Sequence, residues 1–230
     1  MHPFVSVLCP TRDRRTFLPT MLAVFDRFDW PSDRKELIVV DDGRDPVGDL
    51  FRGRDDVRYE HLGVRVALGT KRNRLAELAV GEVHLNLDDD DWSPSNRIAR
   101  AVALLTPDVD VVGRSDLAFW DGPTDTVRVQ PRVGPKHVTA GSMAYRAAWW
   151  RAHRWMPDPH TEERQFLANF TARVVQPDGP SWEWLLAIGH GTNLLPKSAA
   201  MPPAGVRLED VVHDTDLAQT YRGWLTEEAW

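Results

Sequence analysis

Four consecutive aspartates, Asp88–Asp91, follow a strand-like segment at residues 83–87. Their mutual repulsion is costly unless positive charge offsets it, and a bound divalent cation would do so. Carboxylate oxygens suit magnesium, manganese or calcium, and magnesium is typically held by one or two carboxylates together with substrate phosphates. The alternative is an acidic turn before a helix capped by Ser93, because aspartates near a helix start are favourable in any case. A calcium EF-hand loop is not supported, since Ser93 stands where its glycine is required.

A second acidic turn, Asp41-Asp42-Gly43, follows the apolar segment at residues 37–40. Asp-Gly is a common turn pair, so this signal is weak by itself. Its functional interpretation is that one carboxylate accepts a hydrogen bond from a nucleobase or ribose. Basic side chains gather near the same strand ends and could contact an anion or simply be solvated: Arg12, Arg14, Arg15, Lys71 and Arg72.

Strands and helices alternate over the first hundred residues. Apolar runs predict strands at residues 4–9, 37–40, 57–61 and 83–87, and helical spacing predicts helices at residues 16–28, 70–79 and 93–105. Alternation of this kind is typical of a parallel sheet with crossover helices. Ligands bind beyond the carboxyl ends of such strands. The acidic and basic clusters are therefore expected at one rim of an α/β sheet.

The second half of the chain is less regular. A hairpin is expected from residues 117–120 and 127–130 around Asp121-Gly122-Pro123. A helix is expected over residues 161–172, and a terminal helix over residues 214–224. We treat residues 1–230 as a single domain, divided into three parts: about 1–105, about 106–200, and a C-terminal extension at 201–230.

Composition excludes several classes of protein. Hydrophobic residues make up 42% and charged residues 27%, a balance typical of a globular domain. The formal net charge of −6 opposes general nucleic-acid binding. The single cysteine, Cys9, excludes an intramolecular disulfide and any multi-cysteine zinc site. With no signal-like start and no apolar run long enough to form an integral membrane segment, we expect a cytoplasmic location.

The order and spacing of six segments resemble the family 2 glycosyltransferases. The resemblance covers most of residues 4–195, and its segments are VSVLCPTRDR from Val5, LIVVDDG from Leu37, GTKRNRLAELAVGEVHLNLDDDDW from Gly69, AGSMAYRAAWW from Ala140, TEERQFL from Thr161 and HGTN from His190. It implies a GT-A-type, doubly wound, mostly parallel sheet with an irregular C-terminal half that binds the acceptor. It also implies a divalent metal cofactor, Mn²⁺ or Mg²⁺.

The resemblance assigns donor-side roles. Asp41 corresponds to the residue that hydrogen-bonds the base, usually uracil, and Gly141 and Ser142 lie where the family shapes the sugar pocket. Asp90 corresponds to the metal ligand of the DxD pair, and Asp88 lies nearer the ribose and sugar. The remaining donor-side residues implied are Thr11 and Arg12 in the nucleotide loop, Arg72 near the base and diphosphate, Asp88 as a second metal ligand, and Asp89 beside them.

The general base is implied to be one of a glutamate pair. The family usually carries an acidic pair such as Glu-Asp at a helix start, and matching this pattern makes Glu163 the base with Glu162 beside it. Helix capping alone would also favour glutamates there. His190, with Asn193, matches a family position that offers a third metal or diphosphate contact. A plain turn histidine is an equal alternative.

These assignments predict transfer of a sugar, with inversion, from a nucleotide sugar to an acceptor hydroxyl. The expected donor is a UDP-sugar, and neither the sugar nor the acceptor is identified. An inactive nucleotide- or sugar-binding scaffold on the same fold is the main alternative.

Two other enzyme classes fit the sequence less well. A sugar-nucleotide pyrophosphorylase needs a glycine-rich loop after the first strand, and residues 10–13 contain no glycine. A phosphatase with an aspartyl nucleophile usually has its aspartate pair after the first strand rather than the fourth.

Overall fold

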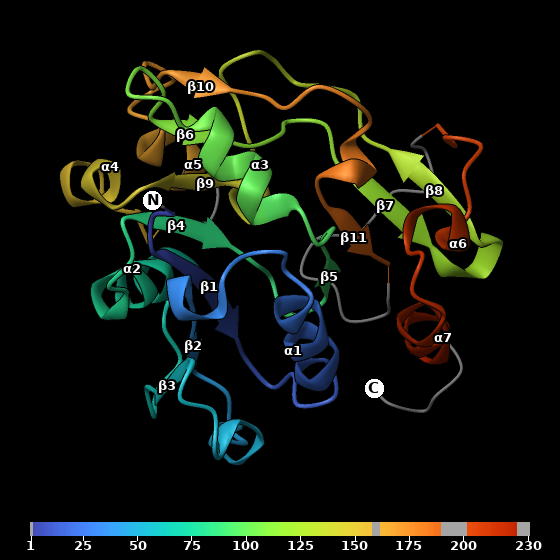
Figure 1. Cartoon of the computed structure of the whole chain (residues 1–230), viewed down its shortest axis with the longest axis horizontal. Helices are drawn as coiled ribbons and strands as arrows, with labels where there is room; N and C mark the ends of the chain where they lie inside the picture. The colour runs from blue at the N-terminus through green and yellow to red at the C-terminus, as the bar shows by residue number, and fades with distance from the viewer. Residues whose placement is uncertain (1, 158–161, 190–201, 225–230) are drawn as a thin grey trace.

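The computed structural model describes residues 2–157, 162–189 and 202–224. Two β-sheets form its framework, and helices pack around the larger one (Figure 1). In chain order, the strands and α-helices are β1 (Val5–Thr11), α1 (Leu18–Asp26), β2 (Lys35–Asp41), β3 (Val57–His61), α2 (Leu68–Leu78), β4 (Val83–Asn86), β5 (Asp91–Trp92), α3 (Arg97–Leu104), β6 (Val111–Val112), β7 (Ala118–Asp121), β8 (Thr126–Val129), β9 (Ala144–Arg146), α4 (Ala147–Ala152), α5 (Glu162–Phe166), β10 (Val174–Val175), β11 (Leu186–Ile188), α6 (Leu208–Val211) and α7 (Thr215–Gly223).

The larger sheet has the strand order β10-β6-β9-β4-β1-β2-β3. β9 runs antiparallel to β4 and β6, and the other strand pairs in this sheet are parallel. The mostly parallel α/β sheet expected from the alternating pattern is therefore confirmed. Thr11 at the end of β1 is in register with Asp41 at the end of β2, and Asp41 with His61. The polar residues that follow these strands consequently meet at one edge.

Each face of this sheet carries its own apolar core. Successive side chains of a strand point to opposite faces, so Val7 and Cys9 of β1 belong to one core, whereas Leu8 belongs to the other. Helices α1, α3 and α7 contribute to the first core, and α2, α4 and α5 to the second. These two layers hold the strand ends that carry the polar residues.

The smaller sheet has the order β5-β11-β7-β8 and lies beside α6 and α7 in Figure 1. The antiparallel pair β7–β8 confirms the expected hairpin. β5 contains Asp91 and Trp92 and pairs with Leu186 and Ala187 of β11. The four aspartates Asp88–Asp91, which we call the acidic segment, therefore connect the two sheets.

Two helices differ from their expected limits. The helix expected from Ser93 begins instead at Arg97, because Asp91 and Trp92 first pair as β5. α5 ends at Phe166 rather than near residue 172, because residues 168–170 form a left-handed turn with φ values of 50°, 54° and 65°. The expected terminal helix is present as α7, and its N-cap, Asp214, accepts a hydrogen bond from the Leu217 amide. Within the described ranges, none of the helices combines the length and apolar character needed to cross a bilayer.

Candidate functional site

Asp41 is held rigidly at the end of β2. Its Oδ1 accepts the Gly43 amide at 2.7 Å, and its Oδ2 accepts the Tyr59 hydroxyl at 2.9 Å and the Val47 amide at 3.3 Å. Burial, and then the hydrogen bond to Asp41, raise the pKa of Tyr59 to about 12. Each carboxylate oxygen offers about two acceptor directions, so these three contacts leave one direction on Asp41, which is 1% exposed.

Lys71 joins the ends of β1 and β2. Its buried ammonium donates to the Thr11 carbonyl at 2.8 Å and to the Asp42 carboxylate, which also accepts the Val66 amide at 2.9 Å. This lysine is therefore part of the framework, and the alternative that it is a solvated surface charge is wrong. The first turns of α2 are thereby fixed against both strand ends.

Asp89 points into the protein from the acidic segment. Its Oδ2 accepts the Thr11 hydroxyl at 2.7 Å, so this hydroxyl is already engaged within the protein. Burial raises the pKa of Asp89 to about 7 and the Asp90 carboxylate adds to the rise, whereas Arg14 and the Thr11 hydroxyl lower it. Asp89 thus ties the acidic segment to the end of β1.

Arginines neutralise much of the remaining aspartate charge. Arg14 donates to the Asp90 carboxylate at 2.9 Å, and both side chains are largely buried. Arg72, on α2, lies 3.4 Å from Asp88, with its guanidinium 5.5 Å from the ring centre of Trp155. The protein itself therefore offsets the repulsion. Repulsion among the aspartates is therefore not, by itself, evidence for a bound cation.

Arg97 is a buried cation that sequence reasoning missed. Its guanidinium donates to Ser93 Oγ at 2.7 Å and to the Gly141 carbonyl at 2.8 Å, and lies 5.7 Å from the ring centre of Trp184. Burial lowers its pKa to about 10, while Asp91 and Asp88 act in the opposite direction. The Ser93–Arg97 spacing of four residues offered only a weak signal, since the contact with Gly141 depends on the fold.

The turn at Ala140–Ser142 brings the donor-side and catalytic candidates together. A Cβ at Gly141 would lie 2.7 Å from Asp88 Oδ2, so any other residue here would force the Asp88 carboxylate to move. The Ala140 amide donates to Glu163 Oε1 at 2.9 Å, and the Ala140 carbonyl accepts Asn86 Nδ2 at 2.8 Å. Asp88 and Glu163 thus lie against adjacent residues of one turn.

The second oxygen of Glu163 faces a histidine. His137 Nε2 lies 3.8 Å from Glu163 Oε2, and the two side chains are 23% and 32% exposed. No sequence signal indicated His137, because it belongs to an irregular segment. Arg12, at the rim of the β1 loop, is 37% exposed and lies 3.7 Å from Asp13. The Glu162 side chain, Thr161, His190 and Asn193 lie outside the described residues.

The sequence profile of glycosyl transferase family 2 matches residues 6–174. This chain belongs to that family. The matched region of this family 2 chain contains Asp41, Arg72, the acidic segment and Glu163. No curated protein matches the chain at a significant level of sequence similarity.

Two solved structures illustrate the shared fold. The mannosyltransferase PcManGT from Pyrobaculum calidifontis, in complex with GDP-Man and Mn²⁺, matches with a TM-score of 0.65 and 17% identity over 82% of this chain and 57% of that one. TarS from S. aureus, in complex with UDP-GlcNAc, matches with a TM-score of 0.67 and 19% identity over 83% of this chain and 60% of that one. The GT-A-type fold expected from the sequence is confirmed, and this family 2 chain spans about three fifths of their length.

The carboxylates of this family 2 chain have suitable donor chemistry for Mn²⁺ or Mg²⁺. Asp88 and Asp90 carry carboxylate oxygens on one loop, and the Asp88 side chain is 31% exposed against 13% for Asp90. In the described part of the chain, no three His, Cys, Asp or Glu residues converge as a metal site. One or two carboxylates suffice when a diphosphate supplies the other oxygens. The residues therefore fit a cation that binds together with a nucleotide.

Proposed function

We propose that this chain is a metal-dependent inverting glycosyltransferase that moves a sugar from a nucleotide sugar, with UDP as the favoured nucleotide, to an acceptor hydroxyl. The observation that carries the proposal is the Ala140–Ser142 turn. Its Gly141 lies beside Asp88, the half-buried donor-side carboxylate, and its Ala140 amide hydrogen-bonds Glu163, the candidate base. A donor and an acceptor that meet at this turn would lie between these two carboxylates.

On the donor side, Asp41 is proposed to accept a hydrogen bond from the base. Arg72 and Arg12 supply positive charge near the diphosphate, and Asp90 and Asp88 are the proposed metal ligands. The names of the two solved structures describe complexes with GDP-Man and UDP-GlcNAc. These complexes support a nucleoside diphosphate sugar as the donor class.

In the proposed mechanism, Glu163 accepts the proton of the acceptor hydroxyl as that oxygen attacks the anomeric carbon. The bond from the anomeric carbon to the diphosphate breaks in the same displacement, which inverts the configuration. The chemistry supplied by a divalent cation, when one is bound, is neutralisation of the charge that develops on the leaving diphosphate. Arg72 stabilises the same charge from α2.

Calorimetric titration with UDP, GDP, dTDP and CDP, each with Mn²⁺ and with a chelator, tests donor binding. We expect one nucleotide to bind tightly only with metal. Asp90→Asn should remove most of the metal-dependent affinity and nearly abolish turnover, while its circular dichroism shows that the fold is intact. Full activity of this variant without metal would exclude the metal role.

Glu163→Gln tests the base. This variant should bind the nucleotide as before and lose turnover by about 100-fold or more, because a carboxamide cannot take the proton. The assay is release of nucleoside diphosphate from a panel of nucleotide sugars. Nucleotide binding without turnover on any donor or acceptor would instead support the inactive scaffold.

A further inference from the structure

One irregular segment, residues 131–142, faces both oxygens of Glu163, and we call it the 131–142 segment. The Ala140 amide donates to Oε1 at 2.9 Å, and His137 Nε2 lies 3.8 Å from Oε2. A separation of 3.8 Å is within ion-pair range but too long for a direct hydrogen bond. An approach of about 0.6 Å would bring the two atoms to the limit of about 3.2 Å for an N–H···O hydrogen bond.

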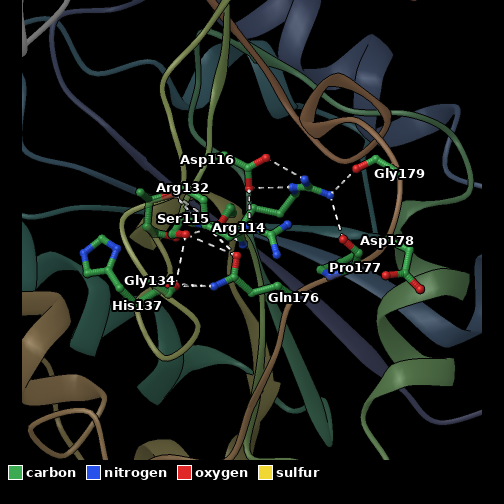
Figure 2. Close-up of polar contacts among 12 residues, drawn as sticks. Arg114, Ser115, Asp116, Arg132, Gly134, His137, Gln176, Pro177, Asp178 and Gly179 are labelled. Atoms are coloured by element: carbon green, nitrogen blue, oxygen red, sulfur yellow. Dashed lines mark hydrogen bonds and ion pairs between the residues drawn. The ribbon is translucent and has the colours of Figure 1, made fainter.

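A polar network anchors the backbone of the 131–142 segment (Figure 2). Gln176 Nε2 donates to the His137 carbonyl at 3.0 Å and to the Gly134 carbonyl at 2.7 Å. Gln176 Oε1 accepts the Ser115 hydroxyl at 3.2 Å, and this hydroxyl also lies 3.2 Å from the Gly134 carbonyl. Gln176, which directly follows β10, therefore fixes the backbone of His137 independently of the contact between His137 and Glu163.

A buried arginine completes this anchor. The Arg114 side chain donates to the Asp116 carboxylate at 2.6 Å, and to the Pro177 and Gly179 carbonyls at 2.7 and 2.9 Å. Its backbone carbonyl accepts the Thr139 amide at 2.9 Å. Arg114 thus joins the residues after Gln176 to the residues after His137. These hydrogen bonds hold the 131–142 segment in one conformation.

The ring of His137 has a second contact, from the turn that follows the helix of Glu163. The ring centre of Phe170 lies 5.9 Å from that of His137. Phe170 has a φ of 65°, within the left-handed turn that follows α5. Such a backbone is unfavourable for a bulky residue and persists only where the surroundings enforce it. The strained turn places Phe170 on the imidazole that faces Glu163.

We propose that His137 is a positioning residue for Glu163, which it orients through Oε2 while the Ala140 amide fixes Oε1. The proposal rests on the proposed role of Glu163 as the base. A carboxylate held at both oxygens cannot rotate freely, so the acceptor direction that remains on each oxygen keeps a fixed aim toward the acceptor hydroxyl. Without His137, the carboxylate rotates about the single remaining hydrogen bond, and proton transfer loses its alignment.

The test uses His137→Ala, His137→Gln and, as a matched control, His153→Ala, whose ring stacks on Trp149 at 3.7 Å. The assay measures kcat and the donor KM for nucleoside diphosphate release with Mn²⁺ from a panel of UDP- and GDP-sugars. We expect His137→Ala to lower kcat by about 10-fold or more with little change in donor KM. His137→Gln, whose amide nitrogen can occupy the place of Nε2, should recover much of kcat. His153→Ala should match the unsubstituted chain.

Equal kcat in His137→Ala and the unsubstituted chain would overturn the proposal. So would a His137→Gln variant as slow as His137→Ala while its circular dichroism and thermal unfolding remain unchanged, because the effect would then reflect packing on Phe170. Full turnover of Glu163→Gln would instead refute the assignment of the base. Absence of turnover in the unsubstituted chain with every donor would refute the proposed function and this inference with it.

Discussion

Replacement of Arg14 by glutamine should increase the affinity of the chain for Mn²⁺ in the absence of nucleotide. Arg14 donates to Asp90 at 2.9 Å and also lies 4.0 Å from Asp89. The Arg14 and Asp90 side chains are 12% and 13% exposed, so solvent screens this ion pair weakly. A cation that binds Asp90 must first displace the guanidinium from the carboxylate.

The size of the effect follows from this ion pair. A hydrogen bond to a charged group contributes about 1.5–3 kcal/mol, and each 1.4 kcal/mol corresponds to about a tenfold change in affinity. Removal of the competing guanidinium should therefore tighten Mn²⁺ binding by about 10- to 100-fold. The gain should be largest without nucleotide, because a diphosphate offers Arg14 another anion when the cation binds.

Arg15→Gln is the matched control, since it removes the same charge from the neighbouring residue. Arg15 pairs with Asp45 and Asp49 at 2.6 and 2.9 Å, away from the acidic segment. Calorimetric titration with Mn²⁺ alone should show tighter binding in Arg14→Gln than in Arg15→Gln. Equal affinities in the two variants, or no gain in Arg14→Gln while its thermal unfolding stays normal, would refute the competition between Arg14 and the metal.

Two further predictions concern Gly141 and His84. Gly141→Ala should weaken nucleotide-sugar binding more than binding of the free nucleoside diphosphate, because the added Cβ would lie 2.7 Å from Asp88 Oδ2. Calorimetric titration with both ligands measures the two affinities. An equal fall in both would contradict this prediction. His84 is 1% exposed, and burial lowers its pKa from 6.5 to about 4. Its stabilising contribution is therefore complete above pH 6.5 and is lost as the pH falls toward about 4. Denaturant unfolding should show that His84→Phe avoids about 2 kcal/mol of the loss that the unsubstituted chain suffers between about pH 8 and about pH 5; parallel pH profiles of the two proteins would contradict the burial argument.

The sheet and the edge at which its polar residues gather could be predicted because both depend on local pattern. The apolar runs at β1, β2 and β4 have the length and composition of buried strands. Parallel strands bring their carboxyl ends to one edge, so the strand pattern places Asp41 and Asp88 at the same edge of the sheet. The β7–β8 hairpin was predictable for the same reason, because its turn residues are adjacent in sequence.

The features that sequence reasoning missed depend on contacts between distant segments. Ser93 and Pro94 carry local signals for a helix start, yet α3 begins at Arg97. The pairing of Trp92 with Leu186 overrides those signals, and no local pattern reveals a strand partner so far along the chain. The contact of His137 with Glu163 likewise depends on how the 131–142 segment is anchored.

The charges around the acidic segment explain why metal and nucleotide are expected to bind together. Arg14 and Arg72 lie against Asp90 and Asp88, and the buried Arg97 offsets further negative charge there. Burial, and then the neighbouring Asp90 carboxylate, raise the pKa of Asp89, which lessens the negative charge of the cluster. The protein thus presents a nearly balanced array, to which a divalent cation alone adds unfavourable positive charge. A diphosphate restores the balance by adding negative charge beside the same arginines. Weak Mn²⁺ binding alone and strong binding with nucleotide is therefore the expected behaviour of the unsubstituted chain.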